Sequence, residues 1–422
     1  MVKKHTVVEL VETTVTLDTS MTEPESKLLE EIKNDHDYVI ALRRHFHKHP
    51  EIAKEEFNTA LKIEEELDKI GLAHQRVGET GVYAEIKGTG AGKSADGNTT
   101  KTIVLRADID ALPIQETHIC EYTSQTPGRM HACGHDSHTA ALLGAARILN
   151  NHKDLFSGTI RLTFQSGEEI GYGARIFVDN GFLDGADRTF GMHAASSLPA
   201  GKIAAVPGPN NASVDWFKIT VNGYPAHVST PQLGADAVYI ASQIVISTQA
   251  IVTRRTSPME NVLVGIGTIK AGDTYNIVAQ KAELEGTIRA FTPETRENTK
   301  QLLIDISKQT AQMFGGTAEV EYKDFTSPLI NDEAATAEVQ KTAVKLFGEE
   351  NVVKSRTASL GGDDFAEYIL KVPGCYAYFG TANPAKEGTT AAHHDSKFDI
   401  DEDTLIQAVS LYTFYALDYL NQ

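Results

Sequence analysis

The stretch HACGHDSHTAALLGAARIL, residues 131–149, joins a polar head rich in metal-binding side chains to an apolar tail. Cys133 and His135 are separated by one residue, so in an extended or turn segment both side chains can point the same way, as two ligands of one metal must. The residues after Thr139 have the apolar spacing of a buried helix. The stretch therefore predicts candidate metal ligands in a loop that leads into a core helix.

Strand and helix patterns alternate around this stretch. Helical patterns open near Glu23 and continue in a second amphipathic run that ends before Gly71, so two helices are expected before the first strand. Short β-branched segments follow, with the sequences VYAEI, TIVLRADI and TIRLTFQ. Alternation of this kind predicts an α/β fold with helices that cover a sheet.

The pattern changes between about residue 211 and about residue 325. Strands such as WFKITV and AELEGTIRAF alternate here with helical segments at 235–252 and 293–313. At 422 residues, the chain exceeds the roughly 250–300 residues at which single cores stop growing. We therefore expect a first domain of residues 23–210 and 326–422, an inserted α+β domain of residues 211–325, and an N-terminal extension of residues 1–22.

Composition narrows the range of partners and locations. The 39 basic and 57 acidic residues give a net charge of −18, which disfavours nucleic acid or an anionic membrane surface as a partner. Acids such as Glu9 and Glu12 lie where a signal peptide needs an apolar stretch, and no run of about 18 apolar residues occurs. The three cysteines are too few and scattered for a disulfide framework. We predict a cytoplasmic protein with a small-molecule or peptide substrate and no membrane partner.

Two pairs of carboxylates follow predicted strands, where open α/β sheets place their sites. Asp108 and Asp110 could orient a ligand imidazole or meet a cation, although a solvated pair at a strand end is an equal alternative. Glu168 and Glu169 are adjacent, so one carboxylate can bind a metal while the other acts as a general base. Adjacent glutamates are also common on helix surfaces.

Further histidines could complete a metal site. His193 follows a short apolar strand, a position where a lone histidine is more often structural, and His393 and His394 are adjacent near the C-terminus. Together with Cys133, His135 and the two carboxylate pairs, these histidines provide thiolate, imidazole and carboxylate ligands in numbers that suit one or two borderline metals. Zinc, manganese and cobalt all fit such ligands.

In order and spacing, the motifs resemble those of the metal-dependent amidohydrolases that include aminoacylases, hippurate hydrolases, auxin (indole-acetyl amino acid) conjugate hydrolases and related carboxypeptidases. The resemblance runs from about Glu30 to the C-terminus and rests on RRHFHKHPE, RADIDALP, HACGHD, GEE, GMH, GYPAH, GTIR, GDDF and HHDSKF. It implies a catalytic domain with a mixed sheet and helices on both faces, and an insert that serves as lid and dimerisation domain.

The resemblance also implies roles for residues of the catalytic domain. Glu168 would be the base that activates water, Asp110 would orient a ligand histidine, and Gly362 would let the backbone approach the substrate. The implied ligands of a two-metal site are Cys133, His135, Glu169, His193 and His394, with His393 as the alternative to the last.

Three residues of the insert receive roles by the same resemblance. His227, in GYPAHVSTP, would reach the active site of a neighbouring subunit and polarise the scissile carbonyl, so we expect a homodimer. Arg289 and Asn276 would bind the carboxylate and the carbonyl of the substrate, and a guanidinium suits a carboxylate because it can pair with it in a bidentate fork. Without the resemblance, His227 would be an ordinary loop histidine.

The implied activity is hydrolysis of the amide bond of N-acyl-L-amino acids with one or two divalent ions per subunit, zinc first and manganese or cobalt next. A carboxypeptidase or dipeptidase of the same family is one alternative. A metal-bearing binding protein without turnover is another, and the intact GEE motif argues against it because loss of Glu168 would be the simplest way to silence the site.

Overall fold

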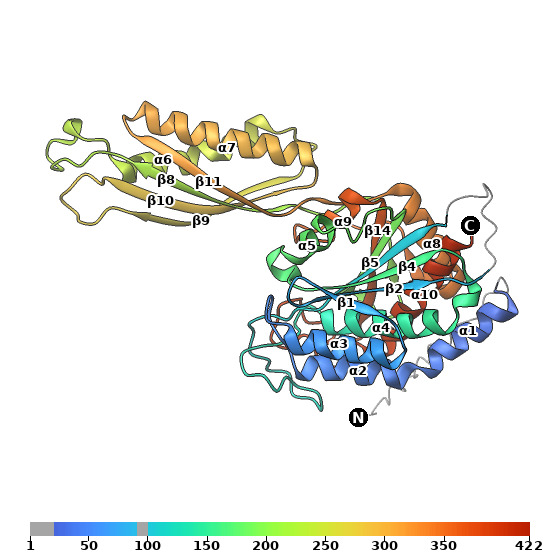
Figure 1. Ribbon diagram of the computed structural model, residues 1–422. Coiled ribbons are helices and arrows are strands. Elements are labelled where there is room, and N and C mark those ends of the chain that lie inside the picture. The colour runs from blue at the N-terminus through green and yellow to red at the C-terminus, as the bar shows by residue number, and fades with distance from the viewer. Residues whose placement is uncertain (1–20, 91–99) are drawn as a thin grey trace, which may run out of the picture.

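A computed structural model describes residues 21–90 and 100–422 of the chain, which form a larger and a smaller unit (Figure 1). The N-terminal extension expected over residues 1–22 lies outside the described residues, except for Met21 and Thr22. Thr22 caps the first helix, because its hydroxyl accepts the N–H of Glu25 while the Glu25 carboxylate accepts the N–H of Thr22.

The larger unit is built on an eight-stranded sheet with the strand order β1-β2-β4-β3-β5-β14-β6-β13. Its central strands β4, β3, β5 and β14 run parallel, whereas β2 is antiparallel to β4 and β6 is antiparallel to β14. The expected mixed sheet is therefore confirmed. Its strands are β1 (His74–Val77), β2 (Gly81–Lys87), β3 (Thr102–Asp108), β4 (Thr159–Gln165), β5 (Arg188–Pro199), β6 (Ile203–Ala204), β13 (Val352–Val353) and β14 (Gly374–Ala382).

Helices cover both faces of this sheet (Figure 1). Successive side chains of a strand point to opposite faces, and accordingly Ile103 and Leu105 of β3 belong to one apolar cluster and Val104 to the other. The first cluster packs α1 (Glu23–Asn34), α2 (His36–Lys48), α3 (Phe57–Lys69), α4 (His135–Asn151), α8 (Glu333–Phe347) and α10 (Leu405–Leu420) on the sheet. The second packs α5 (Gly173–Asp179) and α9 (Ala366–Lys371).

In the described residues, which begin at Met21, three helices precede the first strand where two were expected. The first predicted helix divides between α1 and α2 at Asp35, whose φ of −83° and ψ of 4° lie outside the helical values. Asn and Asp compete with helical hydrogen bonding by binding nearby backbone groups, so the Asn34-Asp35 pair favours a helix end over a helix interior. The apolar periodicity continued across the break and concealed it.

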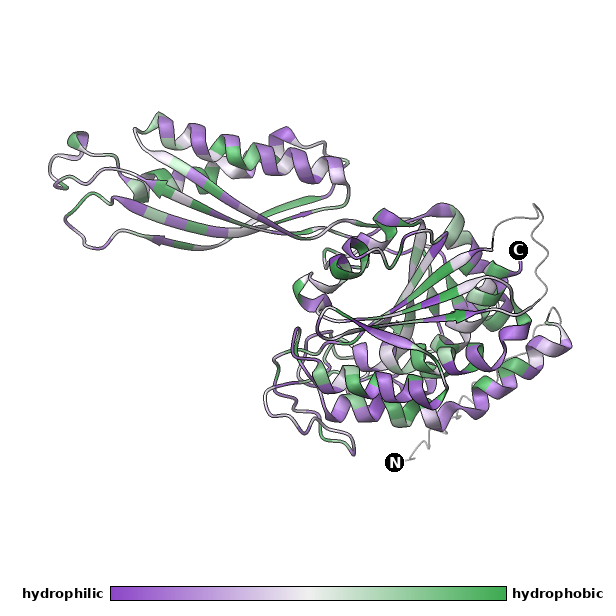
Figure 2. Cartoon of the chain, in the orientation of Figure 1, coloured by the Kyte–Doolittle hydropathy of each residue, from purple (hydrophilic) through white to green (hydrophobic). Residues whose placement is uncertain are grey.

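The smaller unit is a four-stranded antiparallel sheet of order β11-β8-β10-β9, covered by two helices. Its core includes Phe217, Leu284 and Leu303, and Figure 2 shows hydrophilic residues interspersed along its helices and strands. The elements are β8 (Val214–Asn222), α6 (Ala237–Ala250), β9 (Val262–Ala271), β10 (Lys281–Ala290), α7 (Pro293–Met313) and β11 (Thr317–Thr326). A π-helical turn, Ile251–Arg255, extends α6.

The two units are joined by a pair of short strands, β7 (Gly208–Asn211) and β12 (Leu329–Asn331), which lie just before β8 and just after β11. The smaller unit projects away from the larger one in Figure 1. No helix among the described residues is long and apolar enough to cross a membrane.

Candidate metal centre

The candidate ligands gather where the parallel strands of the large sheet end. β3 ends at Asp108, β4 ends at Gln165 just before the GEE motif, and β5 carries His193. Between β3 and β4, the chain enters α4 through Gly134, whose φ of 91° is one that glycine adopts most readily. This left-handed turn places Cys133 before the helix and His135 at its first residue.

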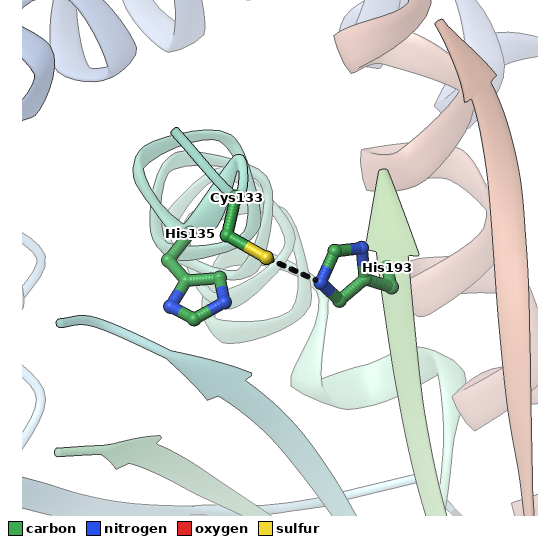
Figure 3. A group of neighbouring side chains, drawn as sticks. All are labelled: Cys133, His135 and His193. Atoms are coloured by element: carbon green, nitrogen blue, oxygen red, sulfur yellow. Dashed lines mark hydrogen bonds between the residues drawn. The ribbon is translucent and has the colours of Figure 1, made fainter. Parts of the chain in front are cut away.

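Cys133, His135 and His193 form the centre of the site (Figure 3). The Sγ atom of Cys133 lies 3.4 Å from Nε2 of His193, and one donor atom from each of the three residues lies within 4.8 Å of the others. His193 donates from Nδ1 to the carbonyl oxygen of Ala194 at 2.6 Å, which leaves Nε2 directed at the thiol. Three donors of this kind are suited to one borderline metal.

His135 is oriented by Asp110. Its Nδ1 donates to the backbone carbonyl oxygen of Asp110 at 2.9 Å and lies 3.3 Å from the Asp110 carboxylate. The carboxylate itself accepts the N–H groups of Glu168 and Glu169, each at 3.1 Å. Asp110 thus fixes both the imidazole and the GEE loop, so that Nε2 of His135 faces the two glutamates at 4.0 and 3.9 Å.

The buried donors leave a gap that a cation would fit. Nε2 of His135 and Oε1 of Glu169 are both buried without a hydrogen-bond partner in the part of the chain that the structure describes. Burial and the negative charges of Glu169 and Glu168 raise the pKa of the Cys133 thiol well above its usual range. Unpaired donors and crowded acids are costly in a buried place, and a divalent cation relieves both.

Both C-terminal histidines reach the centre. Nε2 of His394 lies 3.4 Å from Oε2 of Glu169, and His394 has a φ of 67°. Nδ1 of His393 lies 3.6 Å from Sγ of Cys133, and its ring centroid is 5.0 Å from that of His193. His394 joins Cys133 and Glu169 in a second group of possible ligands, whose donor atoms lie within 4.8 Å of one another. His393 and His394 remain alternatives as the C-terminal metal ligand.

Glu168 is buried beside a second group of acids. One of its oxygens lies within 4.8 Å of carboxylate oxygens of Asp363 and Asp364. Burial, followed by the negative charges of Asp363 and Glu169, raises the pKa of Glu168 well above its usual range. A raised pKa makes this carboxylate a stronger base, as abstraction of a proton from water requires.

His138 is a residue of the site to which the sequence assigned no role. Its Nδ1 donates to Asp108 at 2.5 Å and its Nε2 accepts the N–H of Ala194 at 2.8 Å, so both nitrogens are engaged. It therefore fixes β5 beside His193 and is not a free ligand. The sequence did contain a sign that His138 belongs to the site, because it lies three residues after His135 and so on the same face of the helix.

Except for the fully buried His135, the candidate ligands line a cavity of about 710 Å³. Gly362 lines this cavity, and a Cβ atom at Gly362 would lie 2.3 Å from Cγ2 of Val214 and 2.7 Å from Oγ1 of Thr326. The predicted site residues that line it are Cys133, Glu168, Glu169, His193, Gly362 and His394, joined by the alternative His393.

The three predicted residues of the insert do not line this cavity. His227 and Asn276 are exposed and adjacent, because Val228 donates its N–H to the carbonyl oxygen of Asn276 at 3.2 Å. They lie beyond the far end of β8, whose nine residues span roughly 30 Å. Arg289 lies near the other end of the sheet and donates to Oγ1 of Thr287 at 2.5 Å. One subunit in this arrangement leaves His227 and Asn276 remote from the metal ligands.

Comparison with known proteins assigns these features to a family. A family model described as Peptidase family M20/M25/M40 matches residues 104–418. The chain is 39% identical to N-acetyl-L-cysteine deacetylase of Bacillus subtilis, with 88% of this chain and 85% of that protein covered. It is 37% identical to Thermostable carboxypeptidase 2 of Saccharolobus solfataricus, with 94% and 100% covered. It is 33% identical to IAA-amino acid hydrolase ILR1-like 5 of Arabidopsis thaliana, with 91% and 87% covered.

Two solved structures are similar to this chain in both fold and sequence. A putative aminohydrolase from methicillin-resistant Staphylococcus aureus superposes with a TM-score of 0.88 at 34% identity, over 94% of this chain and 100% of that one. The YXEP protein of Bacillus subtilis, described as a dinuclear metal binding peptidase from the M20 family, superposes with a TM-score of 0.79 at 34% identity, over 92% and 99%.

Proposed function

The chain belongs to the peptidase family M20/M25/M40 and is a metal-dependent amidohydrolase, and from that premise we propose that its cavity hydrolyses the amide bond of N-acyl-L-amino acids. The observation that carries the proposal is the pair of buried donors, Nε2 of His135 and Oε1 of Glu169, which have no hydrogen-bond partner among the residues the structure describes and lie beside the Cys133 thiol. Glu169 and Cys133 line a cavity large enough for a small acyl amino acid.

The proposed ligands are Cys133, His135, Glu169, His193 and His394. Thiolate, imidazole and carboxylate together suit zinc, with manganese or cobalt as alternatives and one or two ions per subunit. When bound, the metal polarises the amide carbonyl and makes a water molecule more acidic. The description of the YXEP protein as dinuclear supports the larger of the two counts.

Glu168 carries the proton through the reaction in this proposal. One of its carboxylate oxygens accepts the proton of the attacking water, and the same group then gives that proton to the nitrogen of the leaving amine. Burial and the carboxylates of Asp363 and Glu169 raise the pKa of Glu168, which makes it a stronger base toward the proton of water. Asp110 acts as a positioning residue, because it holds the backbone of the GEE loop.

The names of the relatives favour a substrate with an acyl group on an amino acid. One relative is named as a deacetylase of N-acetyl-L-cysteine and another as a hydrolase of IAA-amino acids. A carboxypeptidase activity is the second candidate, favoured by the 37% identity to Thermostable carboxypeptidase 2. A cytoplasmic location, expected from composition, stays a prediction.

His227 is proposed to act on a partner subunit. It lies beyond the far end of β8, remote from the ligands of its own chain, so a residue with its implied role must serve another copy. β9 forms an edge of the small sheet, and its Ile269 is half exposed, which makes this edge a suitable surface for a homodimer. Asn276 would travel with His227, while Arg289 would bind the substrate carboxylate from near the junction of the units.

A panel of substrates tests the function. Protein stripped with chelator and reloaded with zinc, manganese or cobalt is assayed with acetyl, benzoyl, lauroyl and indole-acetyl amino acids and with dipeptides. We expect metal-restored release of a free amino acid from at least one acyl class. Cleavage of dipeptides alone would favour the carboxypeptidase or dipeptidase alternative, and silence with metal bound would favour a binding protein.

A further inference from the structure

One cationic side chain in the cavity has no role in the function proposed above. Apart from histidines, Arg356 is the one basic residue among the described residues that line the cavity. Its neighbours in the wall include Tyr378 and Asn211, and apolar residues such as Ile170 and Phe325 also line the cavity. A single guanidinium among aromatic, polar and apolar side chains gives this part of the cavity a distinct chemistry.

Arg356 is held in place but not neutralised. Its guanidinium carbon lies 3.7 Å from the centroid of the Tyr378 ring, and the Tyr378 hydroxyl donates to Oδ1 of Asn211 at 2.6 Å. No carboxylate lies within 4.0 Å of the guanidinium nitrogens, as far as the described part of the chain shows. The buried Arg43 and Arg106, in contrast, each pair with three carboxylates. A stacked guanidinium retains its outward N–H donors for a ligand.

The position of Arg356 relates it to the reacting centre. The Tyr378 ring lies 6.3 Å from the ring of His193, measured between centroids, and His193 is a proposed metal ligand. Arg356 is therefore one aromatic ring removed from the metal ligands. A substrate whose amide lies at the centre would place a substituent, and not the amide itself, beside this guanidinium.

We propose that Arg356 is a specificity-determining residue that selects acyl amino acids with a second carboxylate, in addition to the α-carboxylate. The inference rests on the function proposed above and names the substrate class of the same cavity. A guanidinium binds a carboxylate in a bidentate fork, and the stacking on Tyr378 reduces the freedom that binding would otherwise remove. The second carboxylate has two sources, the amino acid side chain or the far end of a dicarboxylic acyl chain.

Matched pairs of substrates test the proposal. N-acetylglutamate is compared with N-acetylglutamine for the side-chain source, and N-succinylalanine with its terminal amide for the acyl source. In each pair, the charge changes while the shape is nearly conserved. We expect the wild-type protein to have a higher kcat/KM for the anionic member of one pair. The measured quantity is the kcat/KM of the anionic substrate divided by the kcat/KM of its amide. In Arg356→Gln, we expect this ratio to fall on the order of 10- to 100-fold, the loss typical of a charge-assisted hydrogen bond.

Lys354→Gln is the control, because Lys354 lies two residues earlier, is exposed and pairs with Glu349 at 2.6 Å outside the cavity. We expect this variant to keep the wild-type ratio. Equal losses for both members of a pair in Arg356→Gln would indicate that Arg356 binds the α-carboxylate or acts structurally, and would overturn the proposal. If the wild-type protein preferred the anionic member in neither pair, the proposal would also be overturned.

Binding to an inactive protein separates this inference from the proposed function. The affinity of metal-loaded Glu168→Gln for N-acetylglutamate, N-succinylalanine and their amides is measured by calorimetry, with and without Arg356→Gln. Suppose that an anionic compound binds more tightly than its amide, that this preference depends on Arg356, and that the wild-type protein shows no turnover. That result would uphold the carboxylate site and reject the hydrolase. Turnover of acyl amino acids without this selectivity would reject Arg356 and uphold the hydrolase.

Discussion

Nε2 of His135 lies 3.9 Å from Oε1 of Glu169, and both atoms are buried without a hydrogen-bond partner among the residues that the structure describes. Two residues far apart in the chain thus bring ligand atoms without hydrogen-bond partners close to each other. The fixed orientation of His135, by the Asp110 carbonyl, means that its free nitrogen is set before any metal arrives. Such a site favours binding because little reorganisation is needed.

Substitution of the two C-terminal histidines will identify the ligand. We expect His394→Ala to lower metal affinity, since the His394 imidazole faces Glu169 at 3.4 Å. The loss should exceed the about 10- to 100-fold that is typical when a residue hydrogen-bonded to a metal ligand is removed. His393→Ala, the matched control, should have a smaller effect. Metal bound per subunit after dialysis, measured by atomic absorption, checks the prediction, and the reverse order would make His393 the ligand.

Replacement of Glu168 by Gln separates catalysis from metal binding. The amide conserves the shape of the side chain but cannot accept the proton of water, so we expect kcat to fall by about 10²- to 10⁴-fold. Metal content should stay at the wild-type level. Steady-state kinetics and metal analysis of the same preparation check this, and retained turnover would exclude Glu168 as the base.

Mixing two inactive variants tests whether His227 acts across subunits. We expect His227→Ala and Glu168→Gln to be inactive alone, and a mixture unfolded and refolded together to recover about a quarter of wild-type activity. Half of randomly paired dimers are mixed, and each mixed dimer has one complete site. Activity of the refolded mixture is the measurement. No recovery, in mixed dimers verified by affinity tags, would show that His227 serves its own subunit or none.

Gly362 is expected to be intolerant of a larger residue for a packing reason. A Cβ atom there would lie 2.3 Å from Cγ2 of Val214, where β8 leaves the larger unit, so Gly362→Ala should lower the free energy of unfolding by about 1–3 kcal/mol. Gly361→Ala is the control, because its Cβ would meet only the Ser359 hydroxyl, at 3.3 Å. Urea titrations of the two variants check the difference.

The buried His47 links stability to pH. Burial and the Arg43 charge lower its pKa, but Asp136 and Glu116 outweigh them and raise the pKa to about 8. Because the folded pKa exceeds the usual 6.5, the charged imidazole stabilises the fold fully below pH 6.5, and this stabilisation is lost as pH rises through about 8. The difference of about 1.5 pKa units corresponds to about 2 kcal/mol.

Urea titrations at pH 6 and pH 9 measure this contribution. We expect the free energy of unfolding of the wild-type protein to fall by about 2 kcal/mol more over this range than that of His47→Gln. His49→Gln is the control, because His49 is exposed and, within the described part of the chain, its Nδ1 bonds only to the His45 carbonyl oxygen. An identical pH dependence in His47→Gln and the wild type would contradict the prediction.

The sequence determined much of this protein by local rules. The sequence pattern predicted a helix over residues 293–313, and α7 spans these residues, with Thr292 and Pro293 defining its start through short-range contacts. The paired spacing of Cys133 and His135 predicted candidate ligands, since neighbouring residues cannot be far apart in space. Local rules failed at Asp35, where the periodicity of two helices is continuous although the helices are not.

Tertiary structure alone decided which distant residues meet. The two roles of Asp110, whose carbonyl orients His135 while its carboxylate holds the GEE loop, depend on the approach of β3, α4 and β4, which no local pattern encodes. The same holds for His138 and for the stacking of Arg356 on Tyr378. Contacts between segments far apart in the chain arise from the packing of strands and helices, whereas the sequence specifies directly only the preferences of each segment.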